Sequence, residues 1–445
     1  MNPIRISVLT LALGFAASSP AWSLDLLQAY DTALANDATV RAARAAADSG
    51  RERLPQARAA LLPNLSYSGS RFENNLTREQ PNPIGLPTTF RDSYLSDNQT
   101  VTLRQALFRK PLWDAYEQAK FIVEDVNAVL ERELKNLGVR VSGAYMEALL
   151  ANDQLDLVLA QKAFMTVALD VARKSLAAGS GTRTDIDEAQ ARLDMTKAQE
   201  VEARQNLDFT RRQLEVLISE RVGKLEPVNV EKMPLLPPTP ASLDEWVARA
   251  EAANPEILSL KARAEAARLE VKKAEGGHYP SVDMVAQYIS SSSENVNTPN
   301  SSYVNKTIGV QVVVPIYAGG YVSSTVRQAL AQKAQAEELL EAARLDLGVR
   351  VHREFRGVTE GVVRVKALEQ AVKSADQLLV SSRKSFQAGS RSLTDVLNAE
   401  QQRQLALRDL AQARYLYLIS RIRLLALAGA GARDGIEETN AWLGG

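Results

Sequence analysis

The chain of 445 residues contains no cysteine, which excludes disulfide bonds, thiol catalysis and attachment of lipid to an N-terminal cysteine. Histidine occurs at two positions only, His278 and His352, and neither has carboxylates at a spacing typical of metal sites. A phosphate-binding glycine loop is also absent from the sequence. We therefore predict no metal site, no cofactor and no catalytic residue, and we do not expect an enzyme.

The chain also has no excess of positive or negative charge. Lysine plus arginine number 53, and aspartate plus glutamate also number 53. Such a balance creates no field that would attract a polyanion, so nucleic acid is excluded as a partner. Beyond the first residues no run of about 18 apolar residues occurs, which argues against helical membrane spans. Any insertion into a bilayer would have to use strands.

The N-terminus has the pattern of an export signal. Arg5 lies in a short basic region, residues 6–17 form an apolar run, and small residues follow from Ser19 to Ser23. We predict a signal peptide over residues 1–23, cleaved after Ala21 or Ser23. A membrane anchor is the alternative, but the apolar run is shorter than the ~20 residues that a spanning helix needs.

An internal repeat organises the rest of the chain. The sequence Leu137–Val141 recurs unchanged as Leu347–Val351, and Ala178–Ser180 recurs at the same offset as Ala388–Ser390. The proline-rich stretch Met233–Pro240 lies between the two copies and cannot support a regular helix. We predict a first repeat at 24–222 (a helix, a strand pair at 64–108 and a long helical hairpin at 112–219), an inter-repeat linker at 223–241, a second repeat at 242–430 (a helix, a strand pair at 281–317 and a long helical hairpin at 320–428) and a C-terminal tail at 431–445.

Each repeat is expected to contain one unusually long helix. The segment Leu112–Ala178 has no proline, and its apolar residues recur at alternating spacings of four and three, which is typical of a coiled coil. Such a helix would be about 100 Å long, and its counterpart runs from Val322 to Gln387. Gly179 and Gly389 are predicted to end the two helices at hairpin tips. The candidate caps of the returning helices are Thr182 or Thr184, and Ser392 or Thr394.

The segments before the long helices have the pattern of strands. Residues 304–314 alternate between apolar and polar side chains, as do residues 100–107, and 64–72 and 281–290 complete a set of four. The connecting stretches Glu73–Ser93 and Ser291–Ser302 are expected to be external loops. A pair of soluble β-hairpins is the alternative. If the strands lie in lipid, four of them cannot close a barrel, so several copies must share one.

These features together resemble the TolC family of outer-membrane efflux proteins over essentially the whole mature chain. The resemblance rests on the order of the two repeats, the start Leu24–Tyr30, prolines 63 and 280 before the strand pairs, Val314–Tyr317 at the last strand, and the twinned hairpin tips. It implies a mixed α and β fold in which a long α-helical coiled-coil barrel joins a transmembrane antiparallel β-barrel, with four strands per protomer and twelve in a homotrimer. The linker and the C-terminal tail would form an equatorial belt.

The resemblance also implies a function and a location. The trimer would be an exit duct in the cell outer membrane, with a helical tunnel in the periplasm, and would conduct substrates passively for a tripartite efflux or type I secretion system. Its partners would be a periplasmic adaptor protein, an inner-membrane transporter of the ABC or RND type, and outer-membrane lipid. The alternative is that the chain is itself a periplasmic adaptor, but two equivalent hairpins and amphipathic strands favour the duct.

Residue roles follow from the resemblance position by position. Asp185 and Arg391 match a pair that holds the hairpins closed, and Phe386 replaces a tyrosine that joins this latch. Asp395 matches an acidic position of the narrowest ring, and Asn398 stands where relatives have a second aspartate. The latch and the constriction are therefore expected at the hairpin tips, with a less acidic ring than in those relatives.

Overall fold

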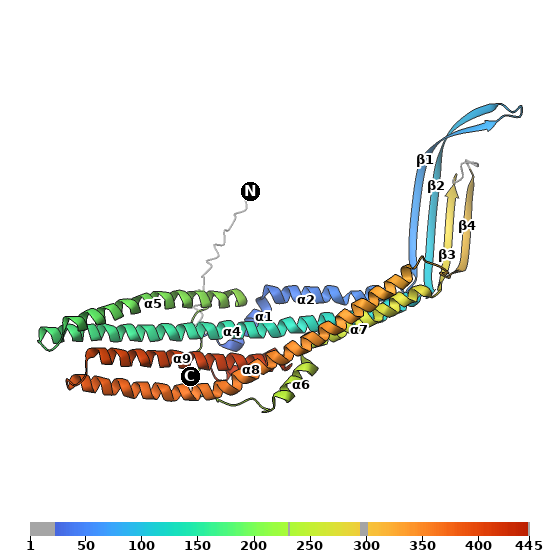
Figure 1. Cartoon of the computed structure of the whole chain (residues 1–445). Helices are drawn as coiled ribbons and strands as arrows, with labels where there is room; N and C mark the ends of the chain where they lie inside the picture. The colour runs from blue at the N-terminus through green and yellow to red at the C-terminus, as the bar shows by residue number, and fades with distance from the viewer. Residues whose placement is uncertain (1–22, 230–231, 294–300, 444–445) are drawn as a thin grey trace, which may run out of the picture.

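The computed structural model describes residues 23–229, 232–293 and 301–443. The predicted signal peptide lies outside these residues, except for Ser23. Two long helical hairpins lie side by side, and a sheet stands at the end of the molecule opposite their tips (Figure 1). The first half consists of α1 (Leu26–Asn36), α2 (Ala38–Arg51), α3 (Arg53–Ala59), β1 (Asn64–Pro81), β2 (Pro87–Phe108), α4 (Lys110–Ala177) and α5 (Arg183–Ile218).

The second half repeats this order. It consists of α6 (Leu243–Ala253), α7 (Pro255–Glu275), the 3-10 turn η1 (Gly276–His278), β3 (Ser281–Ser292), β4 (Ser302–Val313), α8 (Tyr321–Gln387), α9 (Leu393–Leu427) and the additional helix α10 (Ala432–Asn440). With its four strands and two long hairpins, the molecule has the predicted mixed α and β fold.

The long helices α4 and α8 contain 68 and 67 residues, and each therefore spans about 100 Å. Helices α5 and α9 are about half as long and pack on the halves of α4 and α8 that lie away from the sheet (Figure 1). Toward the sheet, α7 packs on both long helices instead. None of the helices in the described part of the chain combines the length and apolarity needed to span a bilayer.

The sheet has the order β1-β2-β3-β4, and every neighbouring pair is antiparallel. Tyr67, Val101, Tyr288 and Lys306 lie in one row across all four strands, so the residues on each face follow from this register. At the base of the sheet Arg109, just before α4, donates from Nε to the Asp283 carboxylate on β3 over 2.8 Å. This ion pair fixes the start of the first long helix against the sheet.

One expectation about the strands was wrong. The segment Glu73–Ser93 was expected to be an external loop, but β1 and β2 pair without interruption to Pro81↔Pro87, and only residues 82–86 turn between them. The polar composition was misleading because two antiparallel strands pair through their backbones and need no continuous apolar face. The other expected loop was Ser291–Ser302. Its first two residues, Ser291 and Ser292, belong to β3, and its last residue, Ser302, begins β4. Residues 294–300 of this loop lie outside the described part.

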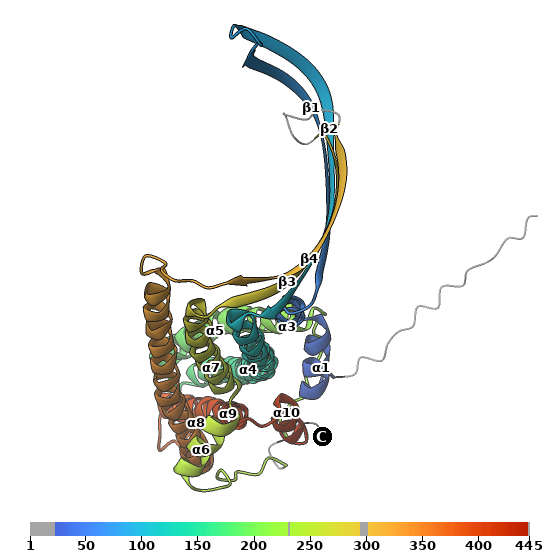
Figure 2. The same cartoon turned by 90° about the vertical axis from the view of Figure 1, so that its right-hand side faces the viewer.

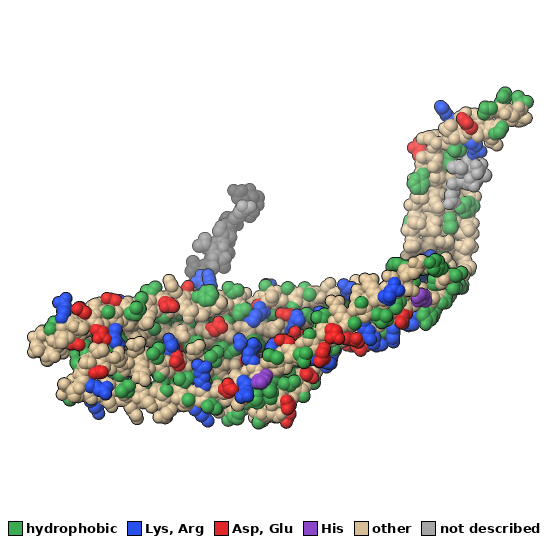
Figure 3. Space-filling view, in the orientation of Figure 1, with side chains coloured by type: hydrophobic (Ala, Val, Ile, Leu, Met, Phe, Trp, Pro, Cys, Tyr) green, Lys and Arg blue, Asp and Glu red, His purple; other side chains and the backbone are tan. Residues whose placement is uncertain are grey.

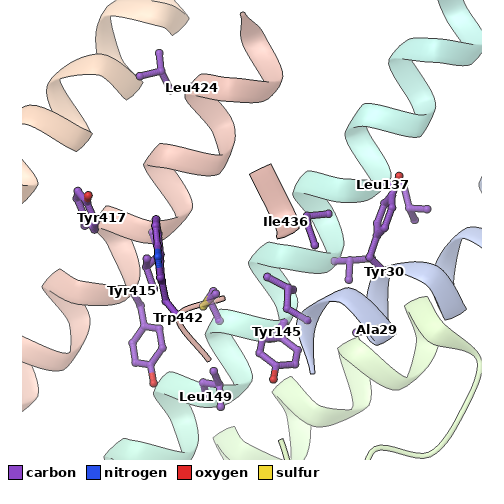
Figure 4. Close-up of a cluster of buried hydrophobic side chains, with 14 of the residues drawn as sticks. Ala29, Tyr30, Leu137, Tyr145, Leu149, Tyr415, Tyr417, Leu424, Ile436 and Trp442 are labelled. Carbon is purple, nitrogen blue, oxygen red and sulfur yellow. The ribbon is translucent and has the colours of Figure 1, made fainter. Parts of the chain in front are cut away.

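The main core lies in the middle of the molecule, where the short helices meet α4 and α9. Side chains from α1, α4, α9 and α10 converge there, with Tyr145 and Trp442 among the largest (Figure 4). The linker also crosses this region. Leu225 forms an isolated β-bridge with Leu24, and Val228 forms another with Leu443. The core therefore ties the two repeats together between the sheet and the hairpin tips.

Candidate functional site at the hairpin tips

The two hairpin tips are built by the same turn. Ala178 and Ala388 are the C-cap residues of α4 and α8, and the following Gly179 and Gly389 have φ angles of 76° and 74°. Glycine adopts this left-handed conformation without the penalty that a Cβ atom brings, and it ends helices for that reason. The amide of Ser180 then donates to the Ser175 carbonyl over 3.0 Å, and the second tip repeats this bond.

The returning helices begin with matching capping boxes. Thr182 and Ser392 are the N-caps of α5 and α9, so of the two alternatives at each tip the earlier residue caps the helix. The carboxylates that complete the boxes belong to Asp185 and Asp395, which accept from the amide and the hydroxyl of the capping residue. Each reciprocal pair satisfies two amides that the first helical turn would otherwise leave free.

Asp185 and Arg391, the two residues predicted to form the latch, belong to different hairpins. The Asp185 carboxylate lies 2.9 Å from the Thr182 amide and 2.7 Å from its hydroxyl. Arg391 lies near its own hairpin, with Nη1 3.5 Å from the Ser382 hydroxyl. Within the described single chain the two side chains form no ion pair with each other, and each is bound to its own hairpin.

Asp395, predicted to line the narrowest ring, is partly exposed at the start of α9. Hydrogen bonds from the side chain and then the backbone of Ser392 hold the pKa of Asp395 below its usual value of 3.8, and the charge of Arg391 acts in the same direction. The carboxylate is therefore ionised at neutral pH. It caps its helix and at the same time presents a negative charge at the tip.

Asn398 lies one turn further along α9 and is bound to the other hairpin. Its Oδ1 accepts from Arg192 Nη2 over 2.7 Å, and the same Arg192 nitrogen lies 2.7 Å from Glu188 Oε1. The hydroxyl of Thr394 donates to the other Glu188 oxygen over 2.6 Å. We call Glu188, Arg192, Thr394 and Asn398 the cross-hairpin cluster. It joins α5 to α9 through charged hydrogen bonds in the partly buried seam between the hairpins.

Sequence reasoning missed Glu188 and Arg192. Their only local signal is the i,i+4 spacing of a glutamate and an arginine, which also occurs on many solvated helix faces. Asn398 was predicted as a ring residue, and the structure adds that its amide oxygen is already occupied by Arg192. A positively charged side chain thus stands beside the position where the second acidic ring of relatives was expected.

Phe386 lies near the end of α8 and is partly buried. It packs against small apolar clusters that include Leu379 and Val396 of its own hairpin and Met165 of the first hairpin. Phe164 lies against the same clusters, and the Arg383 guanidinium lies 4.8 Å from the centre of its ring. The phenylalanine thus connects the hairpins by apolar packing, where a tyrosine would add a hydroxyl.

Away from the tip the seam between the hairpins opens into a groove of about 510 Å³. It begins at Met165 and Arg192 and extends along α4, α5 and α9 to Arg408, with mostly polar or amide side chains along its walls. Figure 3 shows charged side chains of both signs scattered over the helical part. In the described residues no group of three potential metal-ligating side chains occurs.

Comparisons with known proteins agree on one kind of molecule. A family model described as "Outer membrane efflux protein" matches residues 29–220 and 246–430. The chain is 31% identical to proteases secretion protein PrtF of Dickeya chrysanthemi over 98% of this chain and 94% of that protein. It is 34% identical to alkaline protease secretion protein AprF of Pseudomonas aeruginosa over 92% and 85%, and 28% identical to outer membrane protein TolC of Vibrio cholerae over 97% and 96%.

Solved structures show the same fold at lower identity. The chain superposes on a structure of CusC with a TM-score of 0.79 at 18% identity, covering 92% of this chain and 93% of that one. It superposes on the outer membrane protein VceC of Vibrio cholerae with a TM-score of 0.77 at 19% identity, covering 91% and 96%. The arrangement of hairpins and sheet is therefore common to these chains.

Proposed function

The chain belongs to the outer membrane efflux protein family, and from this membership we propose that three copies assemble into one duct that conducts substrates without changing them. Members of this family are channels of the outer membrane, and this chain is an outer-membrane exit duct.

The observation that carries the trimer is the pair of free edges of the sheet. Among the described strands β1 and β4 each pair on one side only. Lipid offers no hydrogen bonds to an open edge, and membrane barrels need at least about eight strands. A second copy would reach eight strands, whereas three reach twelve, the number that family resemblance implies. In such a trimer β4 of one protomer pairs with β1 of the next.

Lipid contact follows from the faces of this sheet. Leu65, Tyr67 and Ile308 lie on one face and are 69%, 67% and 78% exposed in the single chain. Serine and threonine dominate the opposite face, for example Ser66, Thr102 and Thr307. We place the apolar face against outer-membrane lipid and the polar face on the water-filled lumen.

The relatives named for protease secretion suggest the branch to which the duct belongs. PrtF and AprF are both named as protease secretion proteins, and their identities to this chain exceed 30%. We therefore propose that the duct serves type I secretion of a polypeptide. An ABC-type transporter in the inner membrane and a periplasmic adaptor would supply the substrate and the energy, and the adaptor would contact the hairpin tips.

We propose that the hairpin tips close the duct. In the trimer Asp185 of one protomer would face Arg391 of a neighbour, and three copies of Asp395 would form the narrowest ring. Each exposed pair contributes only about 0–1 kcal/mol, which is suitable for a latch that must open. Gly179 and Gly389 give the turns that present these side chains at the entrance.

The experiment that tests the assembly is heat-sensitive migration of the protein from purified outer membranes, combined with amine crosslinking. We expect a band of trimer size before boiling, conversion to 48.6 kDa chains or slightly less after boiling, and crosslinked species that stop at three copies. A soluble periplasmic monomer would contradict the duct and favour the adaptor alternative.

A further inference from the structure

The β1–β2 hairpin extends well past the rest of the sheet. The last rung that β2 shares with β3 is Asp97↔Ser292, whereas β1 and β2 continue to pair from Phe72↔Ser96 to Pro81↔Pro87. These rungs number ten, from residue 72 to residue 81 of β1, and add about 34 Å at ~3.4 Å per residue. We call residues 72–96 the ribbon. Figure 1 shows it standing free of β3 and β4.

Most of the large apolar side chains change faces in the ribbon, where they share a face with the charged Arg78 and Asp92. The face that carries Ser66, Ser68 and Ser70 lower on β1 carries Phe72 and Leu76 in the ribbon, with Phe90 and Tyr94 beside them on β2. We call these four residues the aromatic face; Phe72 and Phe90 are 61% and 58% exposed. The opposite face, which continues the lipid-facing side, now carries mainly polar and charged side chains, among them Glu73, Glu79 and Arg91.

The aromatic face lies on the inner side of the bend. Asn74, Leu76 and Arg78 are less exposed than the alternate residues Asn75 and Thr77, and Tyr94 is only 8% exposed, as expected for the concave side. Figure 2 shows the ribbon continuing the curve of the sheet toward one side. A closed barrel is concave toward its lumen, so the aromatic face is on the lumen side of the wall.

Lipid is not the partner of the aromatic face, because the opposite side of the ribbon, which continues the lipid-facing surface of the sheet, is charged. Figure 3 shows charged side chains returning near the free end of the sheet. The ribbon therefore stands in water beyond the bilayer, with large apolar side chains turned toward the channel axis. Exposed aromatic side chains in such a position indicate a protein contact.

The barrel radius and the ribbon length indicate which partner covers the aromatic face. Twelve strands spaced ~4.8 Å apart and tilted by ~40° give a barrel of about 12 Å radius, so a ribbon of ~34 Å is long enough to reach the axis. Threefold symmetry places two identical ribbons around the same mouth. We propose that the three ribbons of a trimer lean over the outer mouth and pack their aromatic faces on one another, forming a cap on the external side. This inference rests on the proposed trimer.

The absence of cysteine makes a direct test possible. In single-cysteine variants F90C and F72C the thiol lies on the aromatic face, and T89C places it on the opposite face one residue away. Outer membranes that contain each variant are treated with a short bismaleimide and analysed before and after boiling. We expect covalently linked chains from F90C and F72C, and only single chains from T89C.

Three other results would overturn the cap. The aromatic-face thiols could react with a bulky maleimide on intact cells as fast as T89C and give no linked chains, which would mean that the ribbons stand apart. They could be protected without crosslinking, which would mean that another molecule covers the face. A protein that migrates as a monomer before boiling would contradict the proposed trimer itself, and the unboiled lanes separate this failure from the first two.

Discussion

Two buried tyrosines fix the path of the linker across the helices. The hydroxyl of Tyr145 on α4 lies 2.8 Å from the Leu24 carbonyl and accepts from the Glu226 amide over 3.2 Å. Tyr417 on α9 likewise lies 3.0 Å from the Leu236 carbonyl and accepts from the Leu236 amide. Burial raises the pKa of Tyr145, so its hydroxyl remains protonated and able to donate. Both side chains belong to the cluster in Figure 4.

Replacing Tyr145 with phenylalanine should therefore destabilise the protein. Tyr145 is fully buried, and Y145F removes the hydroxyl that bonds to the Leu24 and Glu226 carbonyls and to the Glu226 amide. The Glu226 amide keeps its bond to the Leu24 carbonyl, whereas the Glu226 carbonyl loses the Tyr145 hydroxyl. We expect a loss of about 1–3 kcal/mol, measured by denaturant unfolding in detergent. The matched control is Y317F, because Tyr317 is 88% exposed. Equal stability of Y145F and Y317F would contradict the assignment.

A second residue-scale prediction concerns pH. Asp153 on α4 accepts a hydrogen bond from the Tyr415 hydroxyl over 2.7 Å. Burial, and then the charge of Asp156, raise the pKa of Asp153 above 3.8, although Tyr415 and Arg414 oppose the rise. The folded chain then holds this proton more tightly than the unfolded chain, so the contribution is favourable at low pH and is lost as pH rises through the raised pKa.

The variant D153N removes this dependence because the amide is neutral and keeps an oxygen for Tyr415. We expect D153N to have a higher Tm than the natural chain at about pH 7.5, with the gap closing as pH falls toward the ordinary carboxyl pKa. Thermal unfolding at a series of pH values measures this difference. A gap that stays constant across the series would show that Asp153 does not titrate as described.

At the residue scale the sequence predicted the tip glycines well but missed the cross-hairpin contacts. Gly179 and Gly389 occur in a repeated local motif, and a left-handed turn is a local property. The bond from Arg192 to Asn398 joins residues 206 apart in the chain. It depends on the register between two separate helices, and no local pattern encodes that register.

Among the helical elements, the cross-hairpin cluster is expected to hold α5 against α9. R192A removes the bonds to Glu188 and Asn398 and should cost about 1 kcal/mol, since the site is partly exposed. Spin labels at Ser180 and Ser390 would report a broader distance distribution between the tips by pulsed electron resonance. The control R212A breaks an exposed pair within α5 and should leave the distribution unchanged.

The sequence predicted the bounds of the long helices more accurately than those of the strands. The starts and ends of α4 and α8 agree with the expected helices to within about two residues, because glycine and proline mark their ends. The strands β1 and β2 are longer than expected, since only their lower parts alternate between an apolar and a polar face. In the ribbon the apolar residues change faces, so the pattern that identified the lower part of each strand no longer continues.

For the whole molecule, the described part of one chain is an incomplete object: a sheet whose two outer strands each pair on one side only, and two hairpins whose tips carry charged side chains. The repeat explains this, because each half supplies one strand pair and one hairpin to the same assembly. In the proposed trimer, closure shared by three copies would satisfy both edges of each sheet at once. The proposed latch would have the same character, with Asp185 of one protomer facing Arg391 of a neighbour.

The most direct test of this account is the conductance of the purified protein in planar bilayers, comparing the natural chain with D185A/R391A. The matched control is R183A/D187A, which removes an exposed ion pair, 3.6 Å apart, from the same tip. If the tips are the closed gate of a passive duct, D185A/R391A raises the closed-state conductance and the control does not. An unchanged conductance in D185A/R391A would contradict the gate.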